Sequence, residues 1–370
     1  MSVKQLQILF NVGKILAITP ASFRGKNTTL SEKLYGCFMI IFYTVAVIVS
    51  FVYRVPQYKF YIHIKLAIHV ILDILLYLFC IQTITSALLK RELWCVLIQN
   101  LKITGNGSVN KFNYGLRFFI GNIIFWIMNI YLLSCFTYYF GLEFVKQYSV
   151  DTLQVYVQFN RNFLIWVFLK FFKSRYRAIN RALLNLKKLV KRNHETSIND
   201  TLRRLRYNFV LLENTIHIFN AIFGWTILIS TLHGSLQMII YFDNMLIPTI
   251  TTTVTLLVAN FLILLLYWTG TATIIIICDD VLDEAEQTVV MAYKLQKKMK
   301  FRYNLELTKL ITVVTNNFPR FSAAGFFVIN KSTILKIFDA IVTLLVVVIQ
   351  FDISESYNFA PNYFVNKTVD

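Results

Sequence analysis

Residues able to do metal, redox or nucleophilic chemistry are sparse in this chain of 370 residues. The five cysteines lie far apart and mostly inside apolar runs, which fits neither a disulfide framework nor a zinc site. The densest group of carboxylates, at 279–286, follows directly on an apolar run, and a solvated helix face explains it better than a metal site. Glycine-rich phosphate loops and His-Glu-x-x-His motifs are missing from the sequence. We therefore expect no enzyme, no metal site and no cofactor.

Two polar residues lie in the most apolar part of the chain. The segment TLLVVVIQFD (343–352) is aliphatic up to Gln350, and Asp339 lies further back in the same apolar run. A carboxylate near the centre of a membrane helix costs about 2.5–3.5 kcal/mol. Either its helix face lines a water-filled pore, where it would attract cations, or Asp339 pairs with Lys336 or with a neighbouring helix. The helical face in question carries Leu335, Asp339, Val342 and Val346.

The composition indicates a membrane-embedded body. The chain is 56% hydrophobic and 15% charged, whereas soluble domains have about 45–50% and about 25%. A spanning helix needs about 20 apolar residues, and a sheet edge cannot face lipid. We therefore predict an all-α membrane protein with seven transmembrane helices. They run over Leu34–Val52, Ile62–Leu88, Phe118–Leu142, Leu153–Phe172, Phe219–Phe242, Leu246–Cys278 and Ile334–Phe351.

Basic residues alternate between the segments that connect these helices. Thirty of the 37 lysines and arginines lie in 1–33, 89–117, 170–215 and 279–333, and only four lie in the intervening segments. The positive-inside rule then places the N-terminus in the cytoplasm and the C-terminus outside. The net charge of +18 is explained by a cytoplasmic face next to anionic lipid, so a nucleic-acid partner is not expected.

Two of the basic segments, 170–215 and 279–333, are predicted to be helical. Apolar residues recur in them at three- and four-residue steps, as in amphipathic helices that pack on one another or on other subunits. The stripes are Ile179, Leu183, Leu186 and Val190; Leu202, Leu205, Phe209 and Leu212; and Leu307, Leu310, Ile311 and Val314. We divide the chain into a cytoplasmic segment (1–33), helices one to four (34–172), a helical anchor segment (173–218), helices five and six (219–278), a second anchor segment (279–330), helix seven (331–352) and an extracellular tail (353–370).

Two other classes of membrane protein fit poorly. G-protein-coupled receptors place the N-terminus outside, opposite to the orientation predicted here. Secondary transporters show inverted halves with paired spans interrupted by glycine or proline, and this sequence has no such halves.

The last quarter of the chain carries a family resemblance. The segment GFFVINKSTILKIFDAIVTLLVVVIQFD (325–352) resembles the signature region of the insect gustatory receptors, within the insect chemoreceptor superfamily. In that family the last helix carries Thr-Tyr, five hydrophobic residues and then Gln-Phe. Here Thr343 and Leu344 precede the five hydrophobic residues, and Gln350 and Phe351 follow them. Leu344 stands where the family usually has tyrosine, so any hydrogen bond of that tyrosine is absent.

The resemblance implies a ligand-gated, non-selective cation channel in the plasma membrane of a sensory neuron. Members are tetramers in which each final helix lines one pore, and the final helix is split, here into about 303–318 and 331–352. Gln350 and Phe351 would then lie at the extracellular gate, although Gln350 could instead lie near lipid headgroups. The pore and gate residues so implied are Leu335, Asp339, Val342, Val346, Gln350 and Phe351.

The resemblance also places a ligand pocket in the outer half of the membrane, among the second to sixth helices. His69 and Asp73 are four residues apart and share one helix face. Each candidate alone is better explained as a packing residue than as a ligand contact, but together they describe a polar and aromatic pocket. The main candidates are His69, Asp73, Tyr138, Gln158, His233, Gln237, Tyr241 and Thr252, with Tyr61, His63, Lys65, Tyr131, Tyr139, Gln154, Thr251 and Thr255 in the same region.

We therefore interpret the chain as a gustatory receptor subunit. The expected partners are a small-molecule tastant, cations, membrane lipid and the other subunits of a homo- or heterotetramer. A bitter or otherwise aversive tastant is favoured only because such receptors are the larger branches of the family. The alternative is an odorant-type or accessory chemoreceptor subunit that works only with partner subunits, and the pattern of Thr343, Gln350 and Phe351 favours the first interpretation.

Overall fold

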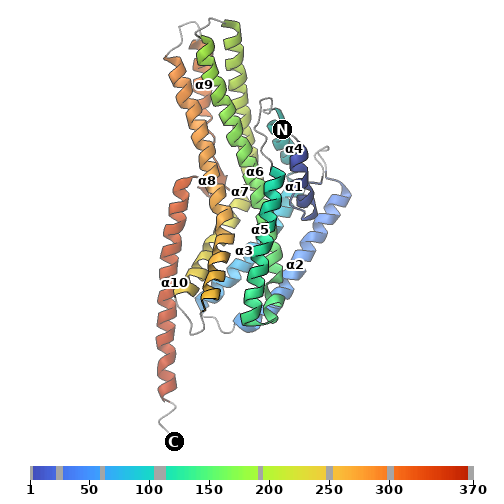
Figure 1. Cartoon of the computed structure of the whole chain (residues 1–370), viewed down its shortest axis with the longest axis vertical. Helices are drawn as coiled ribbons and strands as arrows, with labels where there is room; N and C mark the ends of the chain where they lie inside the picture. Colours follow the sequence, from blue (N-terminus) through green and yellow to red (C-terminus); the bar gives the residue numbers. More distant parts are fainter. Residues whose placement is uncertain are drawn as a thin grey trace.

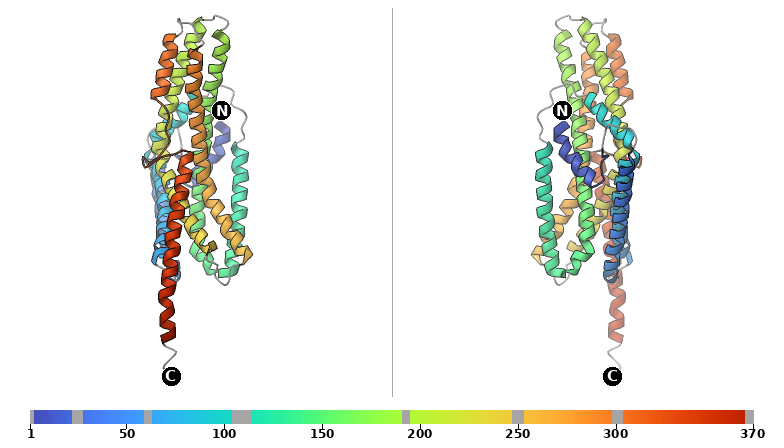
Figure 2. Two further views of the ribbon diagram at one scale, coloured as in Figure 1. Left: turned by 90° about the vertical axis from the view of Figure 1, so that its left-hand side faces the viewer. Right: turned by 90° about the vertical axis from the view of Figure 1, so that its right-hand side faces the viewer.

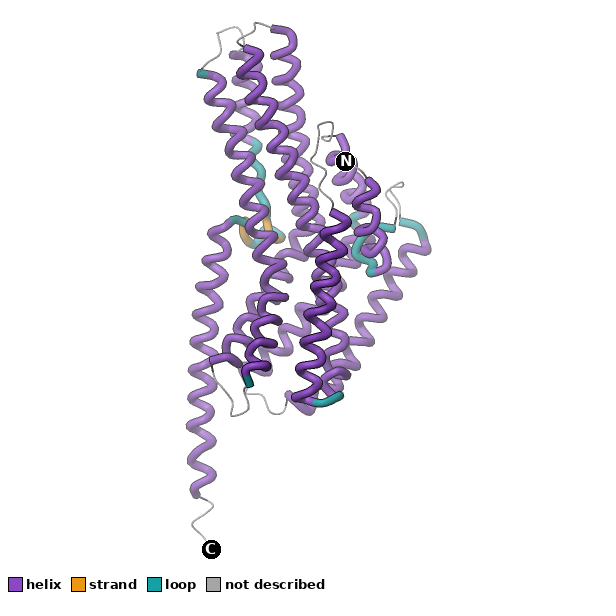
Figure 3. The backbone as a smooth tube through the Cα atoms, in the orientation of Figure 1, coloured by secondary structure: helices purple, strands orange, loops and turns teal. Residues whose placement is uncertain are grey.

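The computed structural model describes residues 3–21, 28–58, 63–103, 114–190, 195–246, 253–297 and 304–365. These residues form ten helices and one short hairpin, shown along the backbone in Figure 3. The helices are α1 (Val3–Ile15), α2 (Leu30–Tyr58), α3 (His63–Leu89), α4 (Arg91–Ile103), α5 (Tyr114–Phe140), α6 (Glu143–Val190), α7 (Glu195–Leu246), α8 (Val254–Gln296), α9 (Asn304–Asn316) and α10 (Lys331–Val365); the strands are β1 (Ser322–Ala323) and β2 (Phe327–Val328).

The helices form two parts that we call the lower body and the upper bundle. Figure 1 shows the lower body, made of α2, α3, α5 and the lower halves of α6, α7 and α8. The upper halves of α6, α7 and α8 continue upward and meet α9 in the narrower upper bundle. Helix α10 runs down the side of the lower body and ends beyond it, as both views in Figure 2 confirm.

Helices α6, α7 and α8 are long enough to belong to both parts. They contain 48, 52 and 43 residues, and a helix rises about 1.5 Å per residue, so each is more than twice the length of a bilayer span of about 20 residues. Their upper halves bury apolar stripes against one another and against α9. The buried stripe residues are Ile179, Leu183, Leu186, Leu202, Leu205, Phe209, Leu212, Leu307, Leu310, Ile311 and Val314.

Six of the described helices are long and apolar enough to cross a membrane: α2, α3, α5, α7, α8 and the part of α10 up to Phe351. Helix α6 contains the predicted fourth span, 153–172, but is not among the six. Its lower half carries polar side chains that lower its hydropathy, and they are buried inside the lower body. These are Gln154, Gln158, Asn160, Arg161 and Asn162. Seven spans therefore stay a prediction.

Helix α2 shows why the lower body suits a membrane. Its buried positions include the polar residues Ser50 and Arg54, whereas apolar residues such as Phe38 and Ile41 lie exposed on its outer face. A soluble helix buries its apolar face and exposes its polar one, and α2 does the opposite. Its outer face thus matches hydrocarbon, and its inner face must supply partners for buried polar groups.

A hairpin joins α9 to α10 and packs against α7. Strands β1 and β2 pair antiparallel, with Ser322 opposite Val328 and Ala323 opposite Phe327. The Asn220 side chain of α7 bonds the first arm of this connection at two points, donating to the Arg320 carbonyl (2.7 Å) and accepting from the Ser322 amide (3.3 Å). The hairpin thereby fixes where α10 begins.

The first turn of α10 is capped within the chain and braced to α8. Asn330 accepts a hydrogen bond from the Thr333 amide (3.2 Å), and Thr333 Oγ1 accepts one from the Asn330 amide (3.3 Å), so the two residues cap the helix reciprocally. Asp279 of α8 accepts a hydrogen bond from the Lys331 amide (3.1 Å) and forms an ion pair with the Lys331 ammonium (2.7 Å). Helix α10 therefore starts at a fixed point on α8.

The acidic group at 279–286 is mostly not a solvated helix face. Asp279 pairs with α10, as described above, and two further members pair with α6. Asp280 pairs with Lys173 (2.6 Å), and Glu284 pairs with Arg177. Glu284 is also buried. The interpretation from sequence was wrong for these three carboxylates because their partners lie far away in the chain and only the packing of α8 against α6 and α10 brings them near.

Candidate ligand site and pore helix

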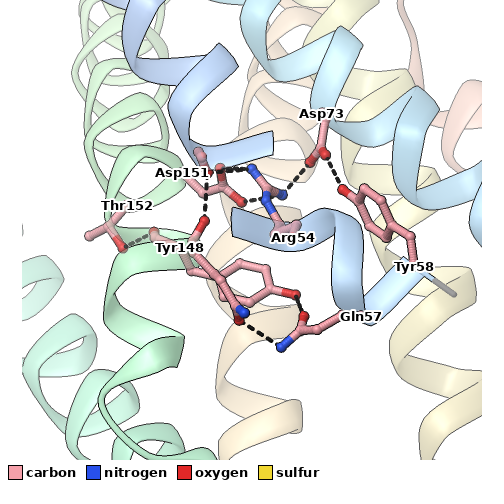
Figure 4. Close-up of polar contacts among 9 residues, drawn as sticks. Arg54, Gln57, Tyr58, Asp73, Tyr148, Asp151 and Thr152 are labelled. Atoms are coloured by element: carbon pink, nitrogen blue, oxygen red, sulfur yellow. Dashed lines mark hydrogen bonds and ion pairs between the residues drawn. The ribbon is translucent and has the colours of Figure 1, made fainter. Parts of the chain in front are cut away.

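Arg54 lies at the centre of a buried group in the lower body that we call the arginine cluster (Ser50, Arg54, Tyr58, Asp73 and Asp151). Figure 4 shows its guanidinium between two carboxylates, Asp73 of α3 and Asp151 of α6. The closest N···O distances are 2.6 Å to Asp73 and 2.9 Å to Asp151. A charge can be buried in a membrane protein when it is paired in this way. One arginine thus ties α2, α3 and α6 together.

The remaining members bond the carboxylate of Asp73 and the guanidinium of Arg54. The Tyr58 hydroxyl donates to Asp73 (2.7 Å), and Arg54 also donates to Ser50 Oγ (2.8 Å). Next to the cluster, Gln57 bonds Gln147 (2.6 Å), which connects α2 with α6 a second time. Both oxygens of Asp73 are therefore engaged within the protein. Asp73 is half of a structural ion pair in this structure rather than a lone carboxylate facing a cavity.

A second buried group, the histidine cluster, lies between α6, α7 and α8 and consists of Gln158, Ser230, His233, Tyr267 and Thr271. Gln158 donates to Ser230 Oγ (2.9 Å), and the Ser230 and Thr271 hydroxyls are 3.3 Å apart. The His233 ring meets the edge of Tyr267, with centroids 5.1 Å apart. The three helices thus gather hydroxyl, amide and imidazole groups in the interior of the lower body.

The histidine cluster contains unused hydrogen-bonding capacity. His233 is 1% exposed, and neither ring nitrogen has a hydrogen-bond partner among the described protein atoms. The same holds for Oε1 of Gln158. Buried polar atoms are nearly always hydrogen-bonded to protein or to water, and a neutral imidazole offers one donor and one acceptor. This group can therefore bind a small polar molecule or water.

The sequence-predicted pocket residues fall into separate places. Gln158 and His233 both belong to the histidine cluster, through Ser230 and Tyr267 respectively, and Gln237 lies half-buried one helical turn below His233. Asp73 belongs to the arginine cluster, with His69 half-buried one turn from it on α3. Tyr241 packs with apolar residues of α8 and α5. Tyr138 is 84% exposed near the end of α5, apart from the other candidates. Thr252, Thr251 and Tyr61 lie outside the described residues.

Sequence reasoning missed several members of both clusters. Arg54 was counted only as a basic residue in a short loop, whereas it lies within α2 and is buried. Its partner Asp151 is 97 positions away in the chain, so no local pattern reveals the pair. Ser230, Tyr267 and Thr271 were also missed, and a search for polar residues within apolar runs could have found them. Among the described residues no group of His, Cys, Asp and Glu could hold a metal ion.

Helix α10 leaves its predicted pore face uncovered in the single chain. Leu335 is 72% exposed, and Asp339, Val342, Val346 and Gln350 are exposed as well. The opposite face packs on α7 and α8: Ile341 and Val348 are buried against Met238, Ile239 and Leu264. In the signature, Leu344 and Phe351 are exposed, and the Thr343 hydroxyl donates to the Asp339 carbonyl (2.9 Å). One chain therefore presents a continuous apolar face that carries one carboxylate.

Comparison with known proteins links these features to chemosensory receptors. A profile described as 7tm chemosensory receptor matches residues 6–355. Gustatory receptor 68a of Drosophila melanogaster is 38% identical over 84 residues, which are 22% of this chain and 21% of that receptor. The match therefore spans only about a fifth of that relative.

The fold is similar to that of two solved structures. The insect olfactory receptor OR5 from Machilis hrabei in complex with eugenol superposes with a TM-score of 0.64 at 13% identity, covering 94% of this chain and 99% of that one. A second structure of OR5 from Machilis hrabei gives a TM-score of 0.57 at 11% identity, covering 93% of this chain and 98% of that one. These similarities establish a shared helical fold.

Proposed function

Because this chain belongs to the 7tm chemosensory receptor family, within the insect chemoreceptor superfamily, we propose that it is one subunit of a ligand-gated cation channel. The family and the six apolar helices make it a multi-pass membrane protein. In the proposed orientation the upper bundle is cytoplasmic, the N-terminus is inside, and α10 crosses the plasma membrane from inside to outside as the seventh span.

The uncovered face of α10 is the observation that carries this proposal. Contact with lipid would not stabilise a helix face that carries a carboxylate, because a charge in hydrocarbon costs several kcal/mol. Repeated around an axis in four copies, Asp339 would form an acidic ring, and such rings favour cations. Gln350 and Phe351 lie at the far end of the same span, where a gate would close. The packing of the opposite face on α7 and α8 would link this helix to a ligand site.

The histidine cluster is the proposed ligand site. It lies between three helices, is polar and keeps unpaired donors and acceptors among the described atoms, as small-molecule sites do. The signature residues and the similarity to a gustatory receptor favour a tastant. Within that class we propose a bitter or otherwise aversive compound. The fold similarity to an olfactory receptor supports the second candidate, an odorant-type or accessory subunit that needs partner subunits.

The test is patch-clamp recording from cells that express this chain alone, challenged with sugars, alkaloids and other tastants. We expect ligand-evoked cation currents. Asp339→Asn should reduce the preference for cations, which the reversal potential measures, and Gln350→Ala should shift the gating of the current. Glu286→Gln, which neutralises an exposed carboxylate on α8, is the matched control and should leave permeation unchanged.

The ligand site is tested in the same recordings through potency. His233→Phe removes both ring nitrogens and should raise the half-maximal ligand concentration on the order of tenfold, the effect of one lost buried hydrogen bond. His217→Phe, on the same helix but exposed, should not. If neither Asp339→Asn nor Gln350→Ala changes the reversal potential or the gating of the current, the pore assignment is wrong. Surface-expressed protein that conducts only with a second receptor subunit would favour the accessory role.

A further inference from the structure

The upper bundle contains a cavity that neither the pore nor the ligand site uses. It has a volume of about 710 Å³ and lies between the end of α4, residues 175–182 of α6 and residues 203–212 of α7. Small-molecule sites commonly have about 300–1,000 Å³. Its lining residues are Ile103, Arg175, Ala178, Ile179, Ala182, Arg203, Arg204, Leu205, Tyr207, Asn208 and Leu212.

The charge of this cavity is of one sign. Three arginines line it, and none of the described lining residues is acidic. Arg203 is 3.9 Å from Glu306, a long contact that neutralises it only in part, and Arg204 has an exposed side chain. The floor is apolar, formed by residues such as Ile179 and Leu205. The cavity therefore combines a cationic wall with a surface that can contact a carbon ring or chain.

Arg175 is a buried cation without an acidic partner. It is 3% exposed, and its described hydrogen bond is the one from Nη2 to the Leu101 carbonyl (3.3 Å). Its Nε–H has no partner among the described protein atoms. A buried charge is stable only when it is paired and hydrogen-bonded. An anion in the cavity would supply both, and the planar guanidinium is suited to two parallel bonds to phosphate oxygens.

The position of the cavity sets the kind of anion. Arg175 lies three residues beyond Phe172, the end of the predicted fourth span, which is about 5 Å along the helix. In the proposed orientation this is the depth of the cytoplasmic lipid headgroups. Arg203 and Arg204 lie on α7 further from the membrane. Basic pockets at this level bind phosphorylated inositol headgroups.

We propose that the cavity between α4, α6 and α7 binds a phosphorylated inositol, either as the headgroup of a lipid or as a soluble inositol phosphate. Arg175 contacts one phosphate from the buried wall, and Arg203 and Arg204 contact others at the rim. A ligand there joins α6 to α7 at the base of the upper bundle. The lipid source rests on the proposed orientation, whereas the soluble source requires only the cavity.

The experiment measures binding to the purified full-length chain. One arm titrates inositol trisphosphate against the chain in detergent. The other places the chain in phosphatidylcholine nanodiscs with or without phosphatidylinositol bisphosphate, and uses phosphatidylserine nanodiscs to control for general negative charge. Arg175→Gln and Arg204→Gln should each weaken binding on the order of tenfold, because a hydrogen bond to a charged group is lost. Arg181→Gln, an exposed arginine on α6 outside the cavity, should not.

The outcomes separate the sources and can reject the site. The site is supported if either ligand binds and if Arg175→Gln and Arg204→Gln weaken that binding while Arg181→Gln does not. Which arm shows the binding then identifies whether the ligand is the lipid, the soluble inositol phosphate or both. Arg175→Gln could fail to fold because Arg175 is buried, so the exposed Arg204→Gln decides in that case. The proposal is wrong if neither ligand binds, if Arg181→Gln weakens binding equally, or if phosphatidylserine binds as well. Since no current is measured, this result is independent of the channel assignment.

Discussion

Arg54 shows at the scale of a single residue how the lower body is held together. Its guanidinium is the only cation described in the arginine cluster, and two carboxylates and a tyrosine converge on it or on its partner Asp73 (Figure 4). Breaking a buried ion pair by removing one partner leaves an uncompensated charge and costs about 3–5 kcal/mol. The two carboxylates would in addition repel each other.

We predict that Arg54→Gln strongly destabilises the protein. The loss should be about 3–5 kcal/mol, because Asp73 and Asp151 then stay buried without a cation, and thermal unfolding of the purified chain in detergent measures it. Adding Asp73→Asn to Arg54→Gln should restore part of the stability. Lys146→Gln is the control, since Lys146 pairs with Glu143 on the surface, where solvent screens the pair and it contributes little to stability. Equal unfolding temperatures for the Arg54 and Lys146 variants would contradict the prediction.

Individual residues were predictable from sequence where a local pattern names them. The stripe residues of the upper bundle whose side chains the structure describes, all of them except Val190, follow a helical period and are buried, as predicted. The clusters of the lower body were not predictable as groups, because Arg54 and Asp151, or Gln158 and Ser230, meet only through packing of distant helices. Buried polar residues within apolar runs can be found in a sequence, but their partners cannot.

At the scale of elements, two glycines of α7 make a controlled comparison. A Cβ added to Gly224 would lie 2.8 Å from the Ala324 amide nitrogen and 3.2 Å from the Ser322 carbonyl oxygen, both backbone atoms of the hairpin. A Cβ on Gly234 would meet nothing closer than 3.6 Å. Both glycines lie inside one helix, where alanine is intrinsically better by about 1 kcal/mol.

We therefore expect opposite signs for the two alanine substitutions. Gly234→Ala should leave the unfolding temperature unchanged or raise it, because alanine favours the helix and its Cβ would make only ordinary van der Waals contacts. Gly224→Ala should lower the unfolding temperature and speed hydrogen exchange at residues 322–328, because the hairpin must move away from α7. Equal effects of the two variants would show that the hairpin does not depend on this contact.

The elements themselves were predicted better than their ends and connections. Apolar length located α2, α3, α5, α7, α8 and α10, but α8 begins at Val254 instead of at 246, and α10 continues beyond 352 to Val365. Helices α1 and α4 were not predicted because they are short and adjoin basic segments. The hairpin was missed because its strands have two residues each, too few for an alternating pattern.

On the scale of the whole molecule, apolar residues are exposed in the upper bundle as well as on α10. Val290 and Tyr293 of α8 and Leu305 of α9 are exposed, although this part projects beyond the proposed membrane (Figure 1). Exposed apolar patches outside lipid mark surfaces that another protein covers. In the proposed channel, other copies of this chain would cover these residues.

We predict that the purified chain forms a tetramer through this surface. Light scattering in a mild detergent should give four times the mass of one chain, and Leu305→Asp should reduce that mass because a charge would then be buried between subunits. Leu89→Asp, the same change at an exposed leucine on α3, should leave the mass unchanged. A single-chain mass for the unmodified protein at every concentration would contradict the prediction and favour an obligate partner subunit.

The attachment of α10 has a mechanical consequence. The helix is held firmly at its first turn, by the hairpin, the reciprocal cap and Asp279, while little of its spanning part is buried in the chain. The helix thus behaves as a lever that pivots about residue 331. Twenty residues make a lever arm of about 30 Å, so a tilt of only about 5° at the fulcrum displaces the tip near Gln350 by about 2.5 Å. A small movement of the first turn would therefore become the largest displacement near Gln350, where the gate is proposed to be, and the side chains of α7 and α8 that pack on Ile341 and Val348 would have to shift with it.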